Sequence, residues 1–265
     1  MSAPAMSDPA PTDLALVRDL EERLFNAWPA LQTIHLDGWL VRMARGHTKR
    51  ANAASPWFPS TLPADELIQA VKALYRKAGI EPMVRITPLA GAGIDAALAA
   101  AGWTLYDPTR VMTASLAGRV ELKGAPAIAL VLAEDPSVDW IEGAAGAYEL
   151  ADWQRDVLAE IVASIRVDAA FATLYLDRQP VGYGLGVAER GYVGLYDLAV
   201  TAAARGQGVG TRLVTGLMHW GRSKGAHTAY LQVREANERA RALYGRLGFE
   251  EVYGYHCRRP PPPTT

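Results

Sequence analysis

The chain has 265 residues with 27 basic and 28 acidic side chains, which gives a formal net charge of −1. This length fits one large domain or two of ordinary size. The balanced charge provides no basic field for nucleic acid or an anionic membrane. A single cysteine, Cys257, cannot form an internal disulfide, and without a neighbouring Cys/His cluster it predicts no metal site.

Both ends of the chain lack the features of a packed or targeted segment. Residues 1–12 are rich in Pro and Ala and have neither the basic start nor the apolar core of a signal peptide. No apolar run approaches the roughly 18 residues of a membrane helix. We therefore expect a soluble cytoplasmic protein that binds no membrane, with disordered tails at 1–12 and 260–265.

Helical and strand-like patterns alternate in the N-terminal part. Apolar residues at helical spacing follow Thr12 or Asp13, either of which could cap a helix that ends before Pro29. The dipeptide Asp37-Gly38 predicts a tight turn between two strands. The pattern further predicts strands at 34–36, 39–43, 48–54, 83–86 and 104–112, and helices at 63–78 and 93–101.

Residues 116–126 form the expected linker to a second part. Gly182, Gly184 and Gly186 there fall on one face of a strand, which leaves room for either a packed helix or a substrate. The pattern of this part predicts strands at 128–132, 171–176, 181–187 and 192–200, and helices at 136–147 and 152–165.

A glycine loop, Arg205-Gly206-Gln207-Gly208-Val209-Gly210, joins the strand at 192–200 to a helix with one apolar face. Unpaired N–H groups and the macrodipole at such a helix start favour an anion, most often a phosphate. The spacing is neither the dinucleotide G-x-G-x-x-G nor the Walker G-x-x-x-x-G-K-[ST]. The loop therefore predicts a phosphate site of another class.

The R-x-x-G-x-G spacing resembles the loop of the GNAT superfamily, the GCN5-related N-acetyltransferases. The resemblance continues through a strand at 230–233 and through Asn237, Leu243-Tyr244 and Gly248-Phe249, which match the last helix and turn of that family. It implies an acetyl-CoA-dependent N-acetyltransferase that transfers the acetyl group directly to an amine. The alternatives are a non-catalytic acetyl-CoA-binding regulatory protein and transfer of a longer acyl group.

The order of elements repeats at a fixed interval. Gly79 and Gly102-Trp103 lie 146 residues before Gly225 and Gly248-Phe249, as an internal duplication would leave them, unless an Ala-rich sequence produces the match by coincidence. We predict two tandem GNAT-like α/β domains, 13–115 and 127–259, each a mixed, mostly antiparallel sheet flanked by helices. Residues 61–66 replace the glycine loop in the first copy, and Asp65 and Glu66 would repel phosphate. The first copy is therefore expected to bind no cofactor.

The resemblance implies which residues would contact acetyl-CoA. Backbone groups of 198–200 would pair with the pantetheine arm, and the amides of the glycine loop would hold the pyrophosphate. Arg205, and less surely Arg212, would add charge-assisted contacts, and Asn237 would cap its helix and reach a pantetheine amide. The implied cofactor-binding residues are Leu198, Ala199, Val200, Arg205, Gly206, Gln207, Gly208, Val209, Gly210, Thr211, Asn237 and Tyr244.

Three residues are candidates for proton transfer. Tyr244 matches the family tyrosine that protonates the departing thiolate, although an aromatic core residue is the alternative. An alkylamine, with a pKa of about 10.4, must lose a proton before it attacks. Asp197 or Glu235 could take that proton, or either could be an ordinary salt-bridged carboxylate. Gln232 stands where family members that acetylate ribosomal-protein N-termini have a Glu, and Gln cannot accept the proton.

The acceptor site is expected on the segment between the two helices of the second part, which overhangs the splayed strands in this fold. Tyr148, Glu149 and Trp153 could attract and enclose a cationic amine, or they could be ordinary residues of amphipathic helices. His219, His227 and His256 are scattered over different elements and receive no role. The expected partner is a small-molecule or peptide amine, with no nucleic acid, and the chain is expected to be a monomer or a homodimer.

Overall fold

The computed structural model describes residues 12–91, 93–118 and 128–261. The predicted tails at 1–12 and 260–265 and the predicted linker at 116–126 lie mostly outside these ranges. We call residues 13–115 the N-terminal half and residues 128–259 the C-terminal half.

Eleven strands form one continuous sheet in the order β1-β2-β3-β4-β11-β5-β10-β9-β8-β7-β6. Only β3/β4 and β9/β10 are parallel neighbours, and the other pairs are antiparallel. The strands are β1 (Gln32–Leu36), β2 (Trp39–Met43), β3 (Ala54–Pro56), β4 (Val84–Ile86), β5 (Thr104–Ser115), β6 (Ile128–Ala133), β7 (Asp168–Leu176), β8 (Gln179–Glu189), β9 (Tyr192–Val200), β10 (Thr228–Arg234) and β11 (Glu250–Arg259).

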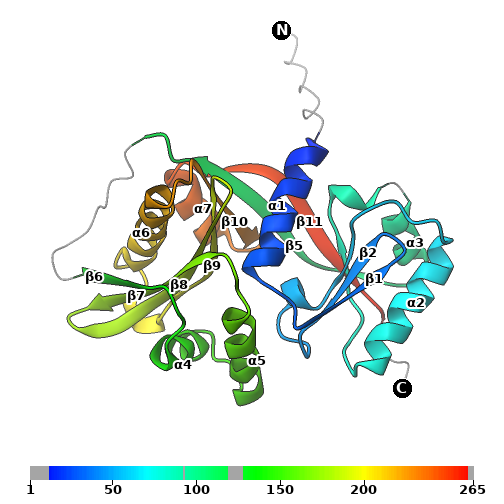
Figure 1. Ribbon diagram of the computed structural model, residues 1–265, viewed down its shortest axis with the longest axis horizontal. Coiled ribbons are helices and arrows are strands. Elements are labelled where there is room, and N and C mark those ends of the chain that lie inside the picture. The colour runs from blue at the N-terminus through cyan, green and yellow to red at the C-terminus, as the bar shows by residue number, and fades with distance from the viewer. Residues whose placement is uncertain (1–11, 92, 119–127, 262–265) are drawn as a thin grey trace, which may run out of the picture.

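The helices flank this sheet, which confirms the predicted mixed and mostly antiparallel architecture (Figure 1). They are α1 (Leu14–Ala27), α2 (Ala64–Lys77), α3 (Ile94–Ala100), α4 (Val138–Ala147), α5 (Asp152–Ala163), α6 (Val209–Ser223) and α7 (Glu238–Arg246). Of the two predicted caps for α1, Asp13 is the one used, because its Oδ1 accepts from the N–H of Ala15 at 2.9 Å.

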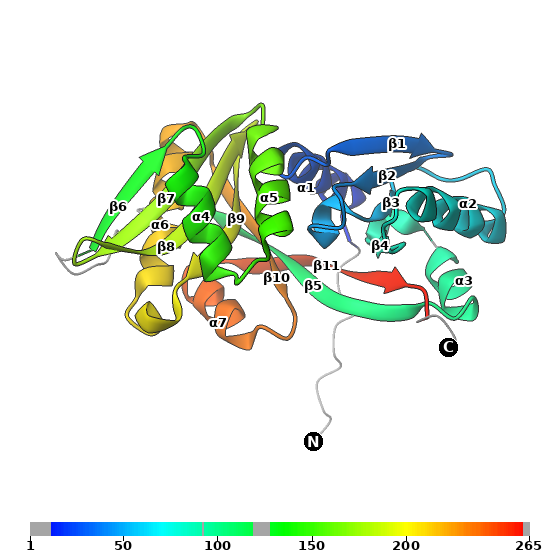
Figure 2. The ribbon, with the colours of Figure 1, turned by 90° about the horizontal axis from the view of Figure 1, so that it is seen from below.

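The last strand of each half lies beside strands of the other half. The second part of β5 pairs with the whole length of β10, from Thr109 opposite Arg234 to Ser115 opposite Thr228. β11 pairs with β4 through Cys257 opposite Arg85. β5 and β11 also pair with each other, and they run lengthwise across the middle of the molecule (Figures 1 and 2). The division at 13–115 and 127–259 thus remains a prediction about the chain, while the sheet crosses both parts without a break.

The two halves repeat the same elements at the predicted interval. Shifted by 146 residues, α2, β4, α3 and β5 fall on α6, β10, α7 and β11, and the start and end of each element agree within two residues. The parallel pairs β3/β4 and β9/β10 occupy corresponding places in the two halves. The exchange of β5 and β11 is therefore symmetric, since each half donates its final strand to the other.

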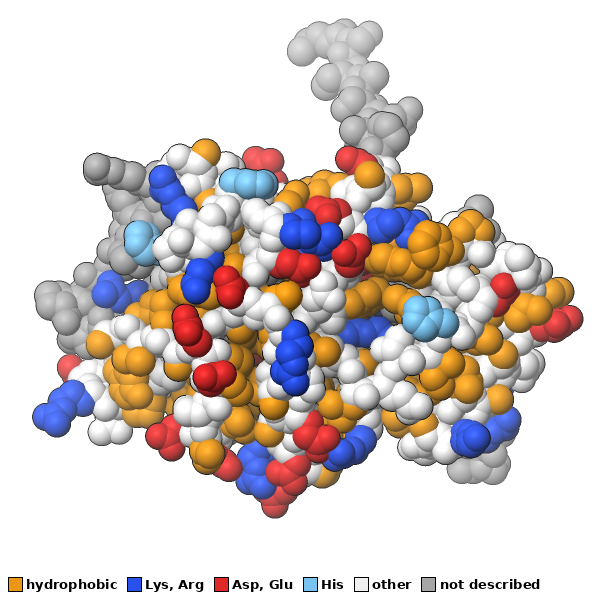
Figure 3. Space-filling view, viewed as in Figure 1, with side chains coloured by type: hydrophobic (Ala, Val, Ile, Leu, Met, Phe, Trp, Pro, Cys, Tyr) orange, Lys and Arg blue, Asp and Glu red, His pale blue; other side chains and the backbone are white. Residues whose placement is uncertain are grey.

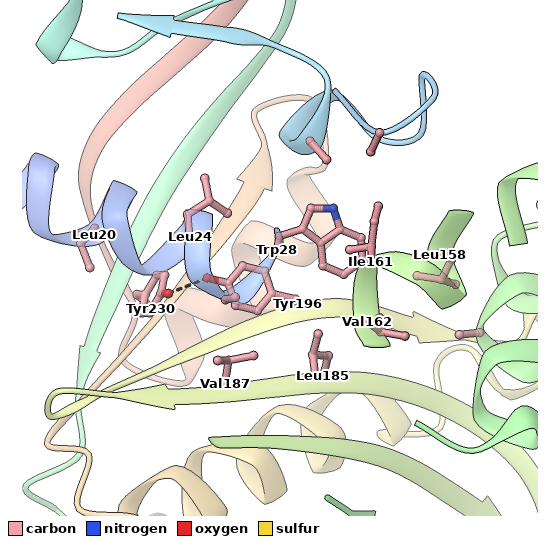
Figure 4. Close-up of a cluster of buried hydrophobic side chains, with 14 of the residues drawn as sticks. Leu20, Leu24, Trp28, Leu158, Ile161, Val162, Leu185, Val187, Tyr196 and Tyr230 are labelled. Atoms are coloured by element: carbon pink, nitrogen blue, oxygen red, sulfur yellow. Dashed lines mark hydrogen bonds between the residues drawn. The ribbon is translucent and has the colours of Figure 1, made fainter. Parts of the chain in front are cut away.

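One hydrophobic core spans both halves on one face of the sheet. Leu20, Leu24 and Trp28 of the N-terminal half share a buried cluster with α5 and with strands β8 and β9 (Figure 4). A buried network reinforces this junction, because the Glu21 carboxylate of α1 pairs with Arg85 of β4 and accepts from the Tyr253 hydroxyl of β11 at 2.5 Å. Burial of an unpaired Arg85 would be costly, so these elements must assemble together.

Helix α6 covers the opposite face of the C-terminal half, and it explains the three glycines of β8. A Cβ on Gly184 would lie 3.2 Å from side-chain carbons of Leu213 and Leu217, and a Cβ on Gly186 would lie 3.0 Å from Leu217. The bare strand face therefore accommodates a helix rather than a substrate, which settles the two alternatives that the alternation left open.

The predicted strand at 48–54 is wrong. Residues Lys49–Ala51 form a 3-10 turn, and β3 begins only at Ala54. The Asn52 side chain is the cause, because its Oδ1 accepts from the N–H groups of Ala44 and Gly46 at 2.7 and 2.8 Å and its Nδ2 donates to Thr48 O at 2.8 Å. These three bonds close the segment into a compact loop, which turns the side chains of 47–50 towards the C-terminal half.

The surface carries charges of both signs. Figure 3 shows acidic and basic side chains interspersed on one face of the molecule, as the balanced composition leads one to expect. Within the described ranges, no helix combines the length and the apolar character that a bilayer crossing requires.

Candidate active site

Strands β9 and β10 separate in the middle of the C-terminal half. They pair from Tyr192 opposite Thr228 to Leu195 opposite Leu231, and no pair follows among the described residues. A bulge in β9 starts the separation, because Asp197 has a φ of +45° and the register with β8 gains one residue between Tyr196 and Ala199. Bulges bend a strand and increase its twist, so Asp197 turns β9 away from β10.

The backbone of β9 beyond the bulge is free on the opened side. Thr201 donates its N–H to Val181 O of β8 at 2.9 Å. Because successive N–H groups of a strand point to opposite sides, those of Leu198 and Val200 point away from β8 and into the space that β10 has left. An extended ligand could pair there as an added strand.

The glycine loop leads from this opened edge to the start of α6. Gly206 and Gly208 have φ values of +83° and +79°, a region that glycine occupies without strain, and Gly208 is the N-cap. In the described part of the chain, no acceptor lies within hydrogen-bonding distance of the N–H groups of 206–211. These donors and the helix dipole form an anion site.

Two arginines flank the anion site. Arg205 is exposed, and its Nε approaches Val200 O at 3.4 Å. The Nε of Arg212 is buried and lacks a partner among the residues described. A buried guanidinium N–H without an acceptor is costly. A Cβ on Gly210 would point between Val200 and Leu243, 3.9 Å from each, so a larger side chain would fill the approach to the loop.

A cavity of about 530 Å³ opens where β9 and β10 separate, a size typical of small-molecule sites. We call it the composite cavity, because both halves of the chain line it. The N-terminal half contributes His47, Thr48, Lys49, Arg50, Tyr106 and Thr109, and the C-terminal half contributes Tyr148, Leu150, Leu195, Tyr196, Asp197, Leu198, Gln232, Val233, Arg234, Asn237, Tyr244 and Tyr255.

Comparison with known proteins assigns the family. A family model described as "Probable histone acetyltransferase Rv0428c C-terminal" matches residues 14–258. The chain belongs to this family. The match extends through both halves, so the N-terminal half is part of the family's common structure.

Relatives and solved structures agree with this assignment. The chain is 26% identical over 245 residues to "Uncharacterized N-acetyltransferase YobR" of Bacillus subtilis (strain 168), covering 91% of this chain and 98% of the relative. A "GCN5-related N-acetyltransferase from Kribbella flavida" shares the fold with a TM-score of 0.69 at 13% identity, covering 92% and 95% of the two chains. A "Tandem GNAT protein from the clavulanic acid biosynthesis pathway (without AcCoA)" has a TM-score of 0.58 at 16% identity, covering 76% and 70%. This chain is therefore a GNAT-type N-acetyltransferase.

Tyr244 of this acetyltransferase lines the composite cavity. Its ring packs against Phe249 with centroids 5.8 Å apart, and its side chain is largely buried. Burial raises the pKa of Tyr244 to about 12, so the hydroxyl keeps its proton at neutral pH. Asn237 lines the same cavity and caps α7, since its Oδ1 accepts from the Ala240 N–H at 3.1 Å.

Both carboxylates predicted as bases are held by arginines. Asp197 lines the cavity, but its Oδ1 accepts from Arg50 Nη2 at 2.8 Å. Glu235 lies in an adjoining, more open hollow and accepts from Arg110 Nη2 at 3.0 Å. That hydrogen bond and the charge of Arg110 lower the pKa of Glu235. Each carboxylate therefore forms an ion pair, as expected if it is an ordinary salt-bridged residue and not a base.

The three residues predicted to bind the acceptor separate in the structure. Tyr148 lines the composite cavity, whereas Glu149 and Trp153 do not belong to its described lining. Gln232 also lines the cavity, where its Oε1 accepts from the Tyr255 hydroxyl at 2.8 Å. Within the described ranges, no group of three or more acidic, His or Cys side chains could hold a metal ion.

The sequence prediction missed the residues that the N-terminal half contributes. Arg50 reaches across the junction to Asp197 and lies over the Trp28 ring, 4.4 Å from its centroid. Burial alone would lower the pKa of Arg50, but the charge of Asp197 and its hydrogen bond outweigh it and raise the pKa. Lys49 pairs with Asp107 and donates to Thr109 Oγ1 at 2.9 Å. The run of cations at 45–50, unsuited to a buried strand, was the one available signal.

Proposed function

We propose that this enzyme uses acetyl-CoA as donor and transfers its acetyl group directly to an amine held in the composite cavity. One observation carries the proposal: the cavity reaches Leu198 on the open edge of β9, and the chain leads from this edge directly to the unbonded amides at the start of α6. The pyrophosphate would lie on the amides of 206–211, with Arg205 and Arg212 beside it.

The remaining part of acetyl-CoA would follow the open edge of β9. Its pantetheine arm would pair with backbone groups of 198–200, and Asn237 would offer a further polar contact. The N–H of Val200 would point at the thioester carbonyl, where negative charge develops as the amine attacks. A donor already aimed at that oxygen lowers the barrier by about 3 kcal/mol.

Direct transfer is favoured over a covalent acetyl-enzyme. Cys257 is fully buried in β11, and burial raises the pKa of its thiol, so it is a poor nucleophile. Tyr244 would donate its proton to the departing thiolate of coenzyme A. Thiols of this kind ionise at a pKa of about 8.5, so this proton would assist departure without being indispensable.

Isothermal calorimetry with acetyl-CoA tests the proposal through two matched variants. Gly210→Asp places a carboxylate in the approach to the glycine loop, and we expect the Kd to rise about 100-fold or more, as two lost charged hydrogen bonds would cause. Ala64→Asp is the control, because Ala64 is the first residue of α2, 146 residues before Gly210. It should leave affinity unchanged. Undiminished binding by Gly210→Asp would contradict the proposed donor site.

A further inference from the structure

Transfer to an alkylamine requires a base, and the two predicted carboxylates are poorly placed for that role. A protonated amine with a pKa of about 10.4 must lose a proton before its lone pair can attack. Asp197 is fixed by Arg50, and Glu235 lies in the adjoining hollow with Arg110. Protonation would neutralise the carboxylate and weaken its ion pair with the arginine.

His47 is a third candidate, and it belongs to the N-terminal half. Its side chain lines the composite cavity, and the residue is only 7% exposed. Its main-chain N–H donates to Ala44 O at 3.0 Å, and Asn52 closes the loop around it. Within the described part of the chain, neither ring nitrogen has a hydrogen-bond partner. A buried imidazole without a protein partner has a lone pair available to a ligand in the cavity.

We propose that His47 is the general base of the reaction, a role that rests on the proposed acetyl transfer. A ring nitrogen of His47 accepts one proton from the bound ammonium. The amine lone pair then attacks the thioester carbonyl, so that a C–N bond forms and the C–S bond breaks. The thiolate leaves with the proton of Tyr244, the second amine proton is lost as the amide forms and replaces the proton that Tyr244 gave, and His47 releases its proton to solvent.

The charges around His47 keep the ring neutral. The charged and titratable groups that line the same cavity are Lys49 and Arg50 of its own loop, Tyr106 of β5, Tyr148 after α4, Tyr196 and Asp197 of β9, Arg234 of β10, Tyr244 of α7 and Tyr255 of β11. Burial lowers the pKa of His47, Asp197 opposes this effect and Arg50 supports it, and the net shift is downward. His47 is therefore unprotonated at neutral pH, as a base must be.

This role also explains why a half without a glycine loop is retained. The loop that carries His47 is folded by N-terminal residues, while the cavity into which it points is opened by the bulge in β9. The site is incomplete without either half. Catalysis by the C-terminal half alone would lack the base.

His47→Gln tests the proposal in the full-length enzyme, with His35→Gln as control because His35 is exposed on β1. Primary amines from a panel serve as acceptors, and the release of free thiol measures turnover. We expect His47→Gln to lower kcat by about 10²- to 10⁴-fold with unchanged acetyl-CoA affinity in calorimetry. His35→Gln should match the wild type.

The pH profile separates a base from a merely structural residue. Wild-type kcat/KM should rise with pH only below about 6.5 and then remain level, because His47 takes the amine proton. In His47→Gln only free amine can react, so kcat/KM should climb about tenfold per pH unit between pH 7 and 9. Wild-type rates or a level profile in this variant would overturn the role of His47.

The test also covers a variant that does not fold and an enzyme without turnover. If circular dichroism shows that His47→Gln does not fold, the His47 ring is instead titrated by NMR in the wild-type complex with acetyl-CoA. Its midpoint should coincide with the kinetic midpoint, and a mismatch would overturn the proposal. Absence of wild-type turnover with every amine would overturn both this role and the proposed function, whereas retained turnover in His47→Gln overturns the base alone.

Discussion

The backbone N–H groups at the start of α6 in the C-terminal half and of α2 in the N-terminal half differ in whether they are hydrogen-bonded. The amides of 206–211 before and within the first turn of α6 are free in the described chain, whereas the amides of Thr61 and Leu62 before α2 both donate to Asp37 Oδ2 at 2.7 Å. Thr61 and Leu62 lie 146 residues before Gln207 and Gly208. The N-terminal half thus satisfies with its own carboxylate the donors that the C-terminal half leaves open for a ligand.

This difference indicates that the two copies have taken different roles after duplication. One helix start is filled from within and is suited to a structural role. The other remains an anion site. The exchange of β5 and β11 then joins the halves so closely that the loop 47–50 of one reaches the cavity of the other. A copy that cannot hold the donor can therefore still shape the acceptor site.

Of the changes considered below, removing Arg50 should weaken the junction between the two halves most. Arg50→Gln leaves Asp197 buried and unpaired, since the two side chains are only 19% and 10% exposed. We expect the free energy of unfolding to fall by about 3 kcal/mol, measured by urea denaturation.

Arg45→Gln is the matched control. Arg45 also pairs across the halves, with Glu160 at 2.7 Å, but these side chains are 60% and 44% exposed. An exposed pair contributes less than about 1 kcal/mol. Equal losses for the two variants would show that the contact through Arg50 has no special part in joining the halves.

Tyr244→Phe tests a residue present in only one half, because the corresponding residue 146 positions earlier is Leu98, in the core. The variant keeps the ring against Phe249 and removes only the hydroxyl. Since the thiolate can leave unaided, we expect kcat to fall by about 10- to 100-fold, with acetyl-CoA affinity unchanged. Steady-state rates equal to those of the wild type would remove the acid role.

Asp37→Asn should have the smallest effect, confined to stability. Hydrogen bonds from Ser60, Leu62 and Thr61 lower the pKa of Asp37 to about 2. A folded pKa below the unfolded value of about 3.9 means that the contribution is complete above pH 4 and is lost as the pH falls towards 2.

Thermal unfolding at several pH values measures this contribution. We expect Asp37→Asn to lower the Tm by a few degrees at pH 7, about the shift of a minor destabilisation, and the difference from the wild type to vanish near pH 2. Asp177→Asn, in the exposed turn between β7 and β8, should change neither. A difference independent of pH would contradict the account of Asp37.

The local features of this molecule were predictable from sequence, and those that depend on distant contacts were not. The glycine loop, the α6 start and the cap at Asn237 each depend on residues within one turn of each other, so their patterns predicted them. The loop at 47–50 depends on Asn52 bonding back to Ala44 and Gly46, and periodicity carried no signal of that closure.

The composite cavity could not be predicted from the sequence, for a different reason. No spacing in the chain predicts that β5 and β11 exchange places or that α1 shares a buried core with β8 and β9, and these contacts join the two halves. The candidates chosen near the glycine loop could therefore be placed, whereas His47 and Arg50 could not. Glu149 and Trp153 were selected by composition alone, and of the three candidates only Tyr148 belongs to the described lining of the cavity.

The stoichiometry of acetyl-CoA binding tests the comparison between the halves most directly. Isothermal calorimetry on the wild-type chain should give one site per chain, because, of the two corresponding helix starts in the described chain, that of α6 has unbonded amides and that of α2 has amides bonded to Asp37. Ala64→Asp should keep that single site and Gly210→Asp should lose it. Two sites per chain, or one site that Gly210→Asp leaves intact, would contradict the account.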